Sequence, residues 1–249
     1  MLLLQVKKVT YIMVVLNSSY FNFGKVFMNS LYKKLNLSNI DTVFLVDIGL
    51  SEEHKDFFNN FEKVKIYDSE LKTDFDDGGT WGNGWQTSVG AKTIMFKHIL
   101  EQTDLPLVMI DGDCIFVKDF EELIDDNYDI QACKRNTSVP YLASFVVAQN
   151  NSRSIEFIDK WIENISKKPL DVPRESPSLG ETISQFGDKI NFKPVDRIKV
   201  STHSENEFCD DTYIIHLKGS SLSKDIKERD LKSLTGAENF SDLIKEYLW

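Results

Sequence analysis

The chain has 249 residues, of which 41% are hydrophobic and 27% are charged. These values are ordinary for a globular protein, and the length allows one large domain or two small ones. The formal net charge of −10 argues against nucleic acid as the main partner. It also means that a phosphate-bearing substrate needs a metal ion or local cations to offset the field.

The cysteines and the apolar runs bear on where the protein works. Cys114, Cys133 and Cys209 are odd in number and lack paired-ligand spacing, which is typical of free thiols in a reducing compartment. No apolar stretch is as long as a membrane span, and the run from Tyr11 to Leu16 is too short for a signal-peptide core. We therefore expect a cytoplasmic protein. The terminal Trp249 is compatible with a weak peripheral membrane contact at most.

The first 67 residues alternate predicted strands with predicted helices. Strands are expected over Val9–Leu16, Thr42–Val46 and Val64–Tyr67, and an amphipathic helix over Phe23–Leu35. Ser51 is a good N-cap for a second helix, since acidic residues follow it. Strand, helix, strand, helix, strand with short connections predicts a parallel sheet of the nucleotide-binding type.

An acidic, glycine-rich stretch over residues 68–88 interrupts this pattern and carries Trp81 and Trp85. It is either a lid or acceptor-binding loop, because aromatic faces pack on sugar rings, or a surface loop pinned by its tryptophans. The helix expected next, over Val89–Leu100, places Lys92 in its first turn. Lys92 is either a solvated surface group or a contact for a donor phosphate.

The stretch Leu107–Val117 is the most informative part of the sequence. Four apolar residues run into Asp111-Gly112-Asp113, and a second apolar run follows. A continuous apolar run is typical of a strand buried on both faces, and ligands bind at the carboxyl ends of such strands. Two carboxylates one residue apart can approach one hard cation. The pattern therefore suggests a divalent metal that holds a diphosphate, although acidic turns after strands are also common.

The rest of the chain continues the α/β pattern and ends in a second candidate ligand. His216 directly follows the last predicted strand. A lone histidine is often structural, but here Lys218 and the Gly219 amide could meet a phosphate beside a metal-bound His216. The further elements expected are helices over Phe120–Ile124, Ser152–Ile165 and Leu179–Phe186, strands over Tyr128–Cys133, Tyr141–Ala148 and Thr212–Ile215, and a proline-containing loop over 166–178.

Together these motifs resemble the GT-A glycosyltransferases, and most of all family 8, which contains glycogenin and the lipopolysaccharide galactosyltransferases. Leu16–Tyr20 is similar to that family's turn for the uridine, and Val46–Glu53 to its second-strand signature. Asp111–Asp113 matches the metal motif, and His216–Gly219 the His-x-x-Gly motif. The resemblance implies one α/β domain over 1–249 with a Rossmann-like, mostly parallel central sheet flanked by helices. Residues 1–117 would mainly bind the nucleotide and 118–249, with the C-terminal helices, the acceptor.

The resemblance also implies roles for individual residues. Mn²⁺ (or Mg²⁺) would be held by Asp111, Asp113 and His216, and Tyr20 would stack on the base. The remaining implied donor contacts are Leu16, Asn17, Lys92, Gly112, Lys218 and Gly219. Three departures from the family pattern stand out: Asn17-Ser18 replaces an acidic pair, Leu142–Ser144 replaces Asn-Ala-Gly, and Leu179–Glu181 keeps one acid of Asp-Gln-Asp.

We therefore predict a metal-dependent transfer of sugar from a nucleotide diphosphate, UDP by the resemblance, to a glycan acceptor in polysaccharide biosynthesis. The metal on Asp111 and Asp113 would stabilise charge on the leaving diphosphate, which makes Asp113 a catalytic candidate. An inverting reaction needs a carboxylate base, for which Glu181 is the candidate. In a retaining reaction Glu181 would instead orient a substrate.

Three other functions compete with this prediction. A haloacid-dehalogenase-type phosphatase also uses Asp-x-Asp, and Gly187-Asp188 imitates its later acidic motif. That enzyme's motif follows the first strand, whereas three predicted strands precede Asp111. A sugar nucleotidyltransferase would need a glycine-rich, arginine-containing loop, which 17–23 lacks. A non-catalytic carbohydrate-binding protein would not need Asp111, Asp113 and His216 together.

Overall fold

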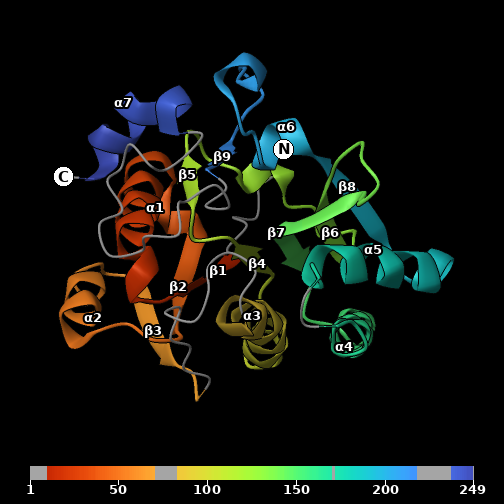
Figure 1. Cartoon of the computed structure of the whole chain (residues 1–249). Coiled ribbons are helices and arrows are strands. Elements are labelled where there is room, and N and C mark those ends of the chain that lie inside the picture. Colours follow the sequence, from red (N-terminus) through yellow and green to blue (C-terminus); the bar gives the residue numbers. More distant parts are fainter. Residues whose placement is uncertain (1–9, 71–82, 170–171, 218–236, 249) are drawn as a thin grey trace, which may run out of the picture.

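The computed structural model describes residues 10–70, 83–169, 172–217 and 237–248 (Figure 1), with the backbone alone for 83–89, 237–239 and 241. Its main elements, in chain order, are β1 (Thr10–Leu16), α1 (Phe21–Lys34), β2 (Ile40–Asp47), α2 (Glu52–Asn59), β3 (Val64–Asp68), α3 (Asn83–Glu101), β4 (Leu107–Ile110), β5 (Cys114–Phe116), β6 (Ile130–Lys134), β7 (Tyr141–Ala148), α4 (Ser152–Ser166), α5 (Glu175–Phe186), β8 (Phe192–Asp196), α6 (Arg197–Val200), β9 (Ile214–His216) and α7 (Ala237–Leu248).

Seven strands form one sheet in the order β3-β2-β1-β4-β7-β6-β8. Strands β1 to β4 run parallel, β7 runs antiparallel to both β4 and β6, and β8 is parallel to β6. All strands except β7 therefore point the same way, and their carboxyl ends meet at one edge. The predicted α/β fold with a mostly parallel sheet is confirmed.

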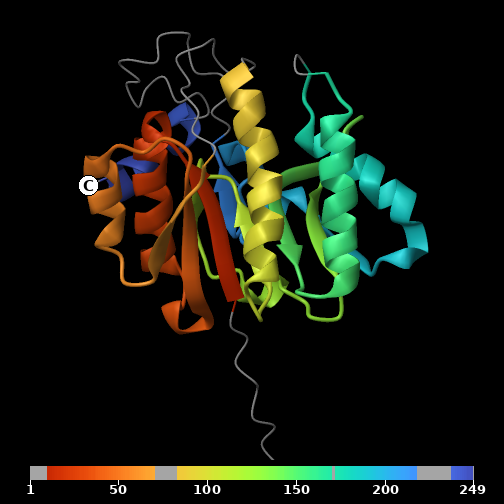
Figure 2. The same ribbon diagram turned by 90° about the horizontal axis from the view of Figure 1, so that it is seen from below.

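Helices cover both faces of the sheet because successive side chains of a strand point to opposite sides. On β1, Val14 packs toward α1 and Phe58 of α2, whereas Met13 packs toward α3 and α4. Figure 2 shows α3 and α4 side by side across the second face. Trp161 of α4 is fully buried in that core. Within the described part of the chain, no helix is long and apolar enough to cross a membrane.

The two apolar runs of the stretch Leu107–Val117 form two strands in two different sheets. β4 ends at Ile110, and β5 leaves the main sheet to pair antiparallel with β9. The turn between them packs tightly, since a Cβ added to Gly112 would overlap Leu16 at the end of β1. Glycine at this position therefore lets the turn approach β1, and the small sheet carries the second half of the motif toward β9.

Other boundaries also differ from those predicted. α3 begins at Asn83, inside the predicted loop 68–88, and residues 71–82 with Trp81 lie outside the described residues. The short helix expected after the motif is a single 3₁₀ turn over Glu121–Leu123. α5 begins at Glu175, four residues earlier than predicted, because a proline is tolerated in the first turn of a helix.

Candidate metal and donor site

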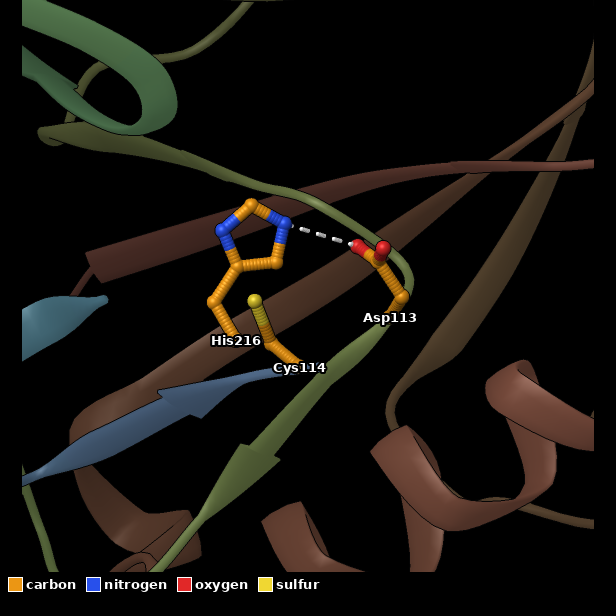
Figure 3. A group of neighbouring side chains, drawn as sticks. All are labelled: Asp113, Cys114 and His216. Atoms are coloured by element: carbon orange, nitrogen blue, oxygen red, sulfur yellow. Dashed lines mark ion pairs between the residues drawn. The ribbon is translucent and has the colours of Figure 1, made fainter. Parts of the chain in front are cut away.

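Asp113 and His216 face each other at the carboxyl edge of the sheet (Figure 3). The Nε2 atom of His216 lies 3.2 Å from Oδ1 of Asp113 and 3.6 Å from Oδ2 of Asp111. The β5–β9 ladder creates this contact, since it pairs Cys114 with His216 and the Leu217 amide donates to the Asp113 carbonyl at 2.8 Å. The structure therefore brings together the three residues predicted as metal ligands.

Serine hydroxyls hold the imidazole of His216 in this orientation. The Ser201 hydroxyl lies 3.0 Å from Nδ1 of His216, and the Ser144 hydroxyl donates to Ser201 Oγ at 3.4 Å. A hydrogen bond at Nδ1 leaves Nε2 directed at the aspartates, which is how outer partners usually orient a metal-binding histidine. Ser201 was not predicted from the sequence, where nothing distinguishes it from other serines.

Cys114 also points into the cluster, and its Sγ lies within 4.8 Å of ligand atoms of Asp113 and His216. Burial, with the charges of Asp113 and Asp111 added, raises the pKa of this thiol well above its usual value. A protonated thiol is a poor ligand, and Mn²⁺ and Mg²⁺ prefer oxygen donors. The donor set that fits a hard cation is therefore two carboxylates and one imidazole.

Lys92 connects this cluster to a buried acid on α5. Its Nζ lies 2.5 Å from Oδ1 of Asp111 and 3.1 Å from Oε2 of Glu175, and it donates to the Ala143 carbonyl at 3.3 Å. The Lys92 and Glu175 side chains are about nine-tenths buried, at 9% and 10% exposure. Lys92 is therefore part of the site, and the interpretation of it as a solvated surface group is wrong.

The charges of this group favour a bound dication. Burial alone would lower the pKa of Lys92, but Asp111 and Glu175 outweigh it and raise that pKa above its usual value. Burial raises the pKa of Glu175 from 4.5 to about 7, although Lys92 opposes this. When Glu175 is ionised, the described part of this group contains three carboxylates, those of Asp111, Asp113 and Glu175, and one ammonium, that of Lys92. A divalent cation would neutralise the two remaining negative charges.

The predicted donor turn lies next to the cluster. Leu16 is buried and packs under Gly112, so the end of β1 touches the metal motif directly. The Asn17 side chain accepts from the Tyr20 amide at 3.2 Å and from Ser19 Oγ at 2.9 Å, which fixes the turn. Tyr20 is half-buried, with its ring centroid 5.2 Å from that of Phe23.

One predicted residue with a described position, Glu181, has its contacts away from the cluster. Glu181 lies on the exposed side of α5, where it pairs with Lys168 at 3.0 Å and accepts from Gln185 at 3.2 Å. Its role as a base stays a prediction. Lys218 and Gly219 lie outside the described residues. Besides Ser201, sequence reasoning missed Glu175, which reaches Lys92 because α5 packs beside α3 and β7.

The fold of this chain is similar to that of solved structures, whereas its sequence has no match in the two sequence comparisons. No family model and no curated protein matches the chain. The galactosyltransferase LgtC, solved with donor and acceptor sugar analogs, aligns with 95% of this chain and 96% of its own at a TM-score of 0.64 and 12% identity. The bifunctional glycosyltransferase WbbM gives 0.63 over 98% of this chain at 11% identity, and the Streptococcus pneumoniae TIGR4 glycosyltransferase GlyE gives 0.60 over 96% at 13%.

Coverage of these neighbours differs. The chain spans half of WbbM and 63% of GlyE, so both contain segments beyond it. Against LgtC the likeness extends over nearly the whole of both chains. At such low identities the likeness concerns the fold. Taken with the sheet order and the Asp-Gly-Asp turn at its carboxyl edge, it shows that this protein has the GT-A glycosyltransferase fold.

Proposed function

We propose that the protein is a metal-dependent glycosyltransferase that moves a sugar from a nucleotide diphosphate, a UDP-sugar, to a glycan acceptor. The observation that carries this proposal is the convergence of Asp111, Asp113 and His216 beside a buried lysine. It lies at the sheet edge where α/β folds bind nucleotides. The LgtC structure with donor and acceptor sugar analogs supports it, since that protein binds both substrate classes on this fold.

The side chains divide the work in this proposal. Asp111, Asp113 and His216 would hold Mn²⁺ or Mg²⁺, which supplies positive charge to the leaving diphosphate. Lys92 keeps its ammonium charged beside Asp111 and can share that task. Gly112 lets the motif approach Leu16 and the donor turn with Asn17 and Tyr20, and Lys218 with Gly219 would complete the phosphate site.

The acceptor would bind mainly to the second half of the chain. Residues 118–249 would supply most of it, as the strands β6 and β8 end at the same sheet edge as β4. Glu181 would serve as the base in an inverting reaction or orient a substrate in a retaining one. For Glu181 to act as the base, its ion pair with Lys168 would have to open.

Calorimetric titration of UDP into the purified protein tests the proposal, first with Mn²⁺ and then with excess chelator. We expect binding that requires the metal. Asp113→Ala and His216→Ala each remove a proposed metal ligand. They should weaken binding by at least about 100-fold, the upper end of the loss when an outer partner of a ligand is removed.

Two variants serve as matched controls. His98→Ala removes an exposed histidine that contacts Tyr67 and Gln102, so UDP binding should not change. Asp188→Asn removes the exposed acid that a phosphatase mechanism would use. If the protein binds no nucleotide in any condition, the glycosyltransferase proposal fails. Hydrolysis of p-nitrophenyl phosphate that needs Asp188 would then support the phosphatase.

A further inference from the structure

A cavity of about 610 Å³ opens where β6 and β8 end. Its wall comes from the β6–β7 connection, the end of β8, α6 and the segment after it. Four lining side chains are or can become cationic: Lys134, Arg135, Arg197 and His203. Positive charge is therefore concentrated in this cavity wall, although the chain as a whole has a formal net charge of −10.

The cavity adjoins the proposed metal site through His203. The Nδ1 atom of His203 lies 3.4 Å from the backbone carbonyl of His216, and the two imidazole centroids are 5.7 Å apart. His203 thus belongs both to the cavity wall and to the surroundings of the metal cluster. A molecule in the cavity would lie beside the place where the proposed donor sugar reacts.

Two acids also line the cavity: Arg197 binds both carboxylate oxygens of Glu207, and the Ile198 amide binds one oxygen of Asp196, the register partner of Lys134. Glu207 accepts from Arg197 Nη1 at 2.8 Å and from Nη2 at 2.5 Å, so this pair is bidentate. Oδ1 of Asp196 accepts from the Ile198 amide at 3.0 Å, which caps α6. Neither acid lies within ion-pair distance of Lys134 or Arg135.

Arg135 and Lys134 are the cations that remain. Arg135 donates Nε to the Val139 carbonyl at 2.6 Å, and no carboxylate among the described residues forms an ion pair with it or with Lys134. Partial burial lowers the pKa of Arg135, Cys133 opposes this effect, and the charge of Arg197 adds to it. A half-buried guanidinium without an anion is costly, so an anionic ligand would be favourable here.

We propose that this cavity is an acceptor subsite for an oxyanion, a carboxylate or a phosphate on the glycan, recognised by Arg135 with help from Lys134. The proposal rests on the proposed glycosyltransferase function, because that function makes a neighbour of the metal site an acceptor site. A guanidinium binds carboxylate and phosphate groups through paired N–H donors. The substrate class that follows is an acidic or phosphorylated sugar chain.

Ligand titrations followed by amide NMR shifts test the subsite with three small probes. They are methyl glucoside, methyl glucuronide and glucose 6-phosphate, which share a ring and differ in charge. We expect one or both anionic probes to bind about 10- to 100-fold more tightly than methyl glucoside, the range for a hydrogen bond to a charged group. The largest changes in amide chemical shift should occur at Lys134, Arg135 and His203. A preference between the anionic probes would identify carboxylate or phosphate.

Substitutions of Arg135 give the decisive comparison. Arg135→Gln should abolish the preference for the anionic probes, and Arg135→Lys, which keeps the charge but loses the paired donors, should retain part of it. Lys167→Gln removes an exposed lysine at the end of α4 and should change nothing. Thermal unfolding of each variant checks that it folds. Equal binding of all three probes, or an unchanged preference in Arg135→Gln, overturns the proposal.

The same samples separate this proposal from the previous one. Metal-dependent UDP binding without any preference for anionic probes would leave the glycosyltransferase function standing and remove the subsite. A preference that depends on Arg135, in a protein that binds no nucleotide, would leave an anionic sugar site and remove the glycosyltransferase function.

Discussion

The Lys92 ammonium lies between Asp111 and Glu175, at 2.5 Å and 3.1 Å from their carboxylate oxygens. Removing one member of a buried ion pair leaves its partner charged and unsolvated, which is costly. Glu175 belongs to this group although it is no predicted metal ligand. Its effect on Lys92 is that of a positioning residue, since its ion pair fixes the ammonium beside Asp111.

The raised pKa of Glu175 predicts a specific pH dependence of stability. Its pKa is about 7 in the folded protein and near 4.5 when unfolded, so the folded state binds more protons between these values. The contribution of Glu175 to the free energy of unfolding is therefore greatest below about pH 4.5 and falls as pH rises toward 7. Urea unfolding of the wild type and Glu175→Gln, both in chelator, measures this contribution as their difference.

The difference between the unfolding free energies of the wild type and Glu175→Gln removes, to first order, the contributions of the other titrating groups. The wild type should lose stability relative to the variant from pH 4.5 to 7, and the difference should then stay level. Glu163→Gln serves as a control, because that carboxylate lies on the exposed side of α4 and pairs with Lys160 and Lys167. A difference for Glu175→Gln that is flat, or that grows with pH, would contradict the raised pKa.

At the scale of elements, the site depends on the contact between the end of β1 and the turn after β4. A Cβ on Gly112 would overlap Leu16, and Leu16 is itself buried. Gly112→Ala should therefore lower the free energy of unfolding by about 1–3 kcal/mol through overpacking. Leu16→Ala should cost about 2–5 kcal/mol through the cavity that it leaves. Urea unfolding measures both effects.

A double-mutant cycle shows whether the two effects share one contact. In Gly112→Ala with Leu16→Ala the new methyl group enters the space that leucine vacates, so the combined loss should fall short of the sum by about 0.5–3 kcal/mol. Gly90→Ala is the matched control, since no atom of the described residues lies within 4 Å of a Cβ there and helix propensity favours alanine by about 1 kcal/mol. Strict additivity of the two variants would contradict the proposed overlap.

Elements could be predicted from the sequence wherever their own residues determine them. The run Tyr141–Ala148 was predicted with the bounds of β7, because a stretch that is apolar except for Ser144 is typical of a buried strand. β8 (Phe192–Asp196) was missed, since it contains Pro194 and alternates with charged residues. A proline is acceptable there because β8 is an edge strand, which the sequence does not reveal.

The same reasoning separates the predicted and the missed parts of the site. Asp111 and Asp113 follow an apolar run and His216 ends another, so strand patterns marked each as a candidate ligand. The resemblance to family 8 then joined the three in one metal site. Glu175 has no such signal, because its burial depends on how α5 packs against α3 and β7. Arg135 likewise faces a cavity only through the meeting of β6, β8 and α6.

In the molecule as a whole, residues far apart in the sequence pack against the strands that carry the proposed metal ligands. α7 packs on α1, and one apolar cluster joins both helices to the small β5–β9 sheet, as Figure 1 shows for the elements. Its members are Phe23, Val26, Ile115, Ile215, Leu217, Phe240, Ile244, Tyr247 and Leu248. Ile115 and Ile215 are direct neighbours in sequence of Cys114 and His216. The rigidity of the cluster around the metal site therefore depends in part on the last described helix.

This arrangement predicts that a substitution in α7 loosens the metal site. Ile244 is 1% exposed, so Ile244→Ala should cost about 2–5 kcal/mol in unfolding free energy. Amide hydrogen exchange should accelerate in β9 and at Leu217, whose amide binds the Asp113 carbonyl, more than in the distant strand β3. Glu246→Ala removes an exposed ion pair with Lys33 and should leave the free energy of unfolding and the exchange in β9 nearly unchanged. If Ile244→Ala accelerates exchange equally in β3 and β9, or in neither, α7 does not stabilise the ligands through this cluster.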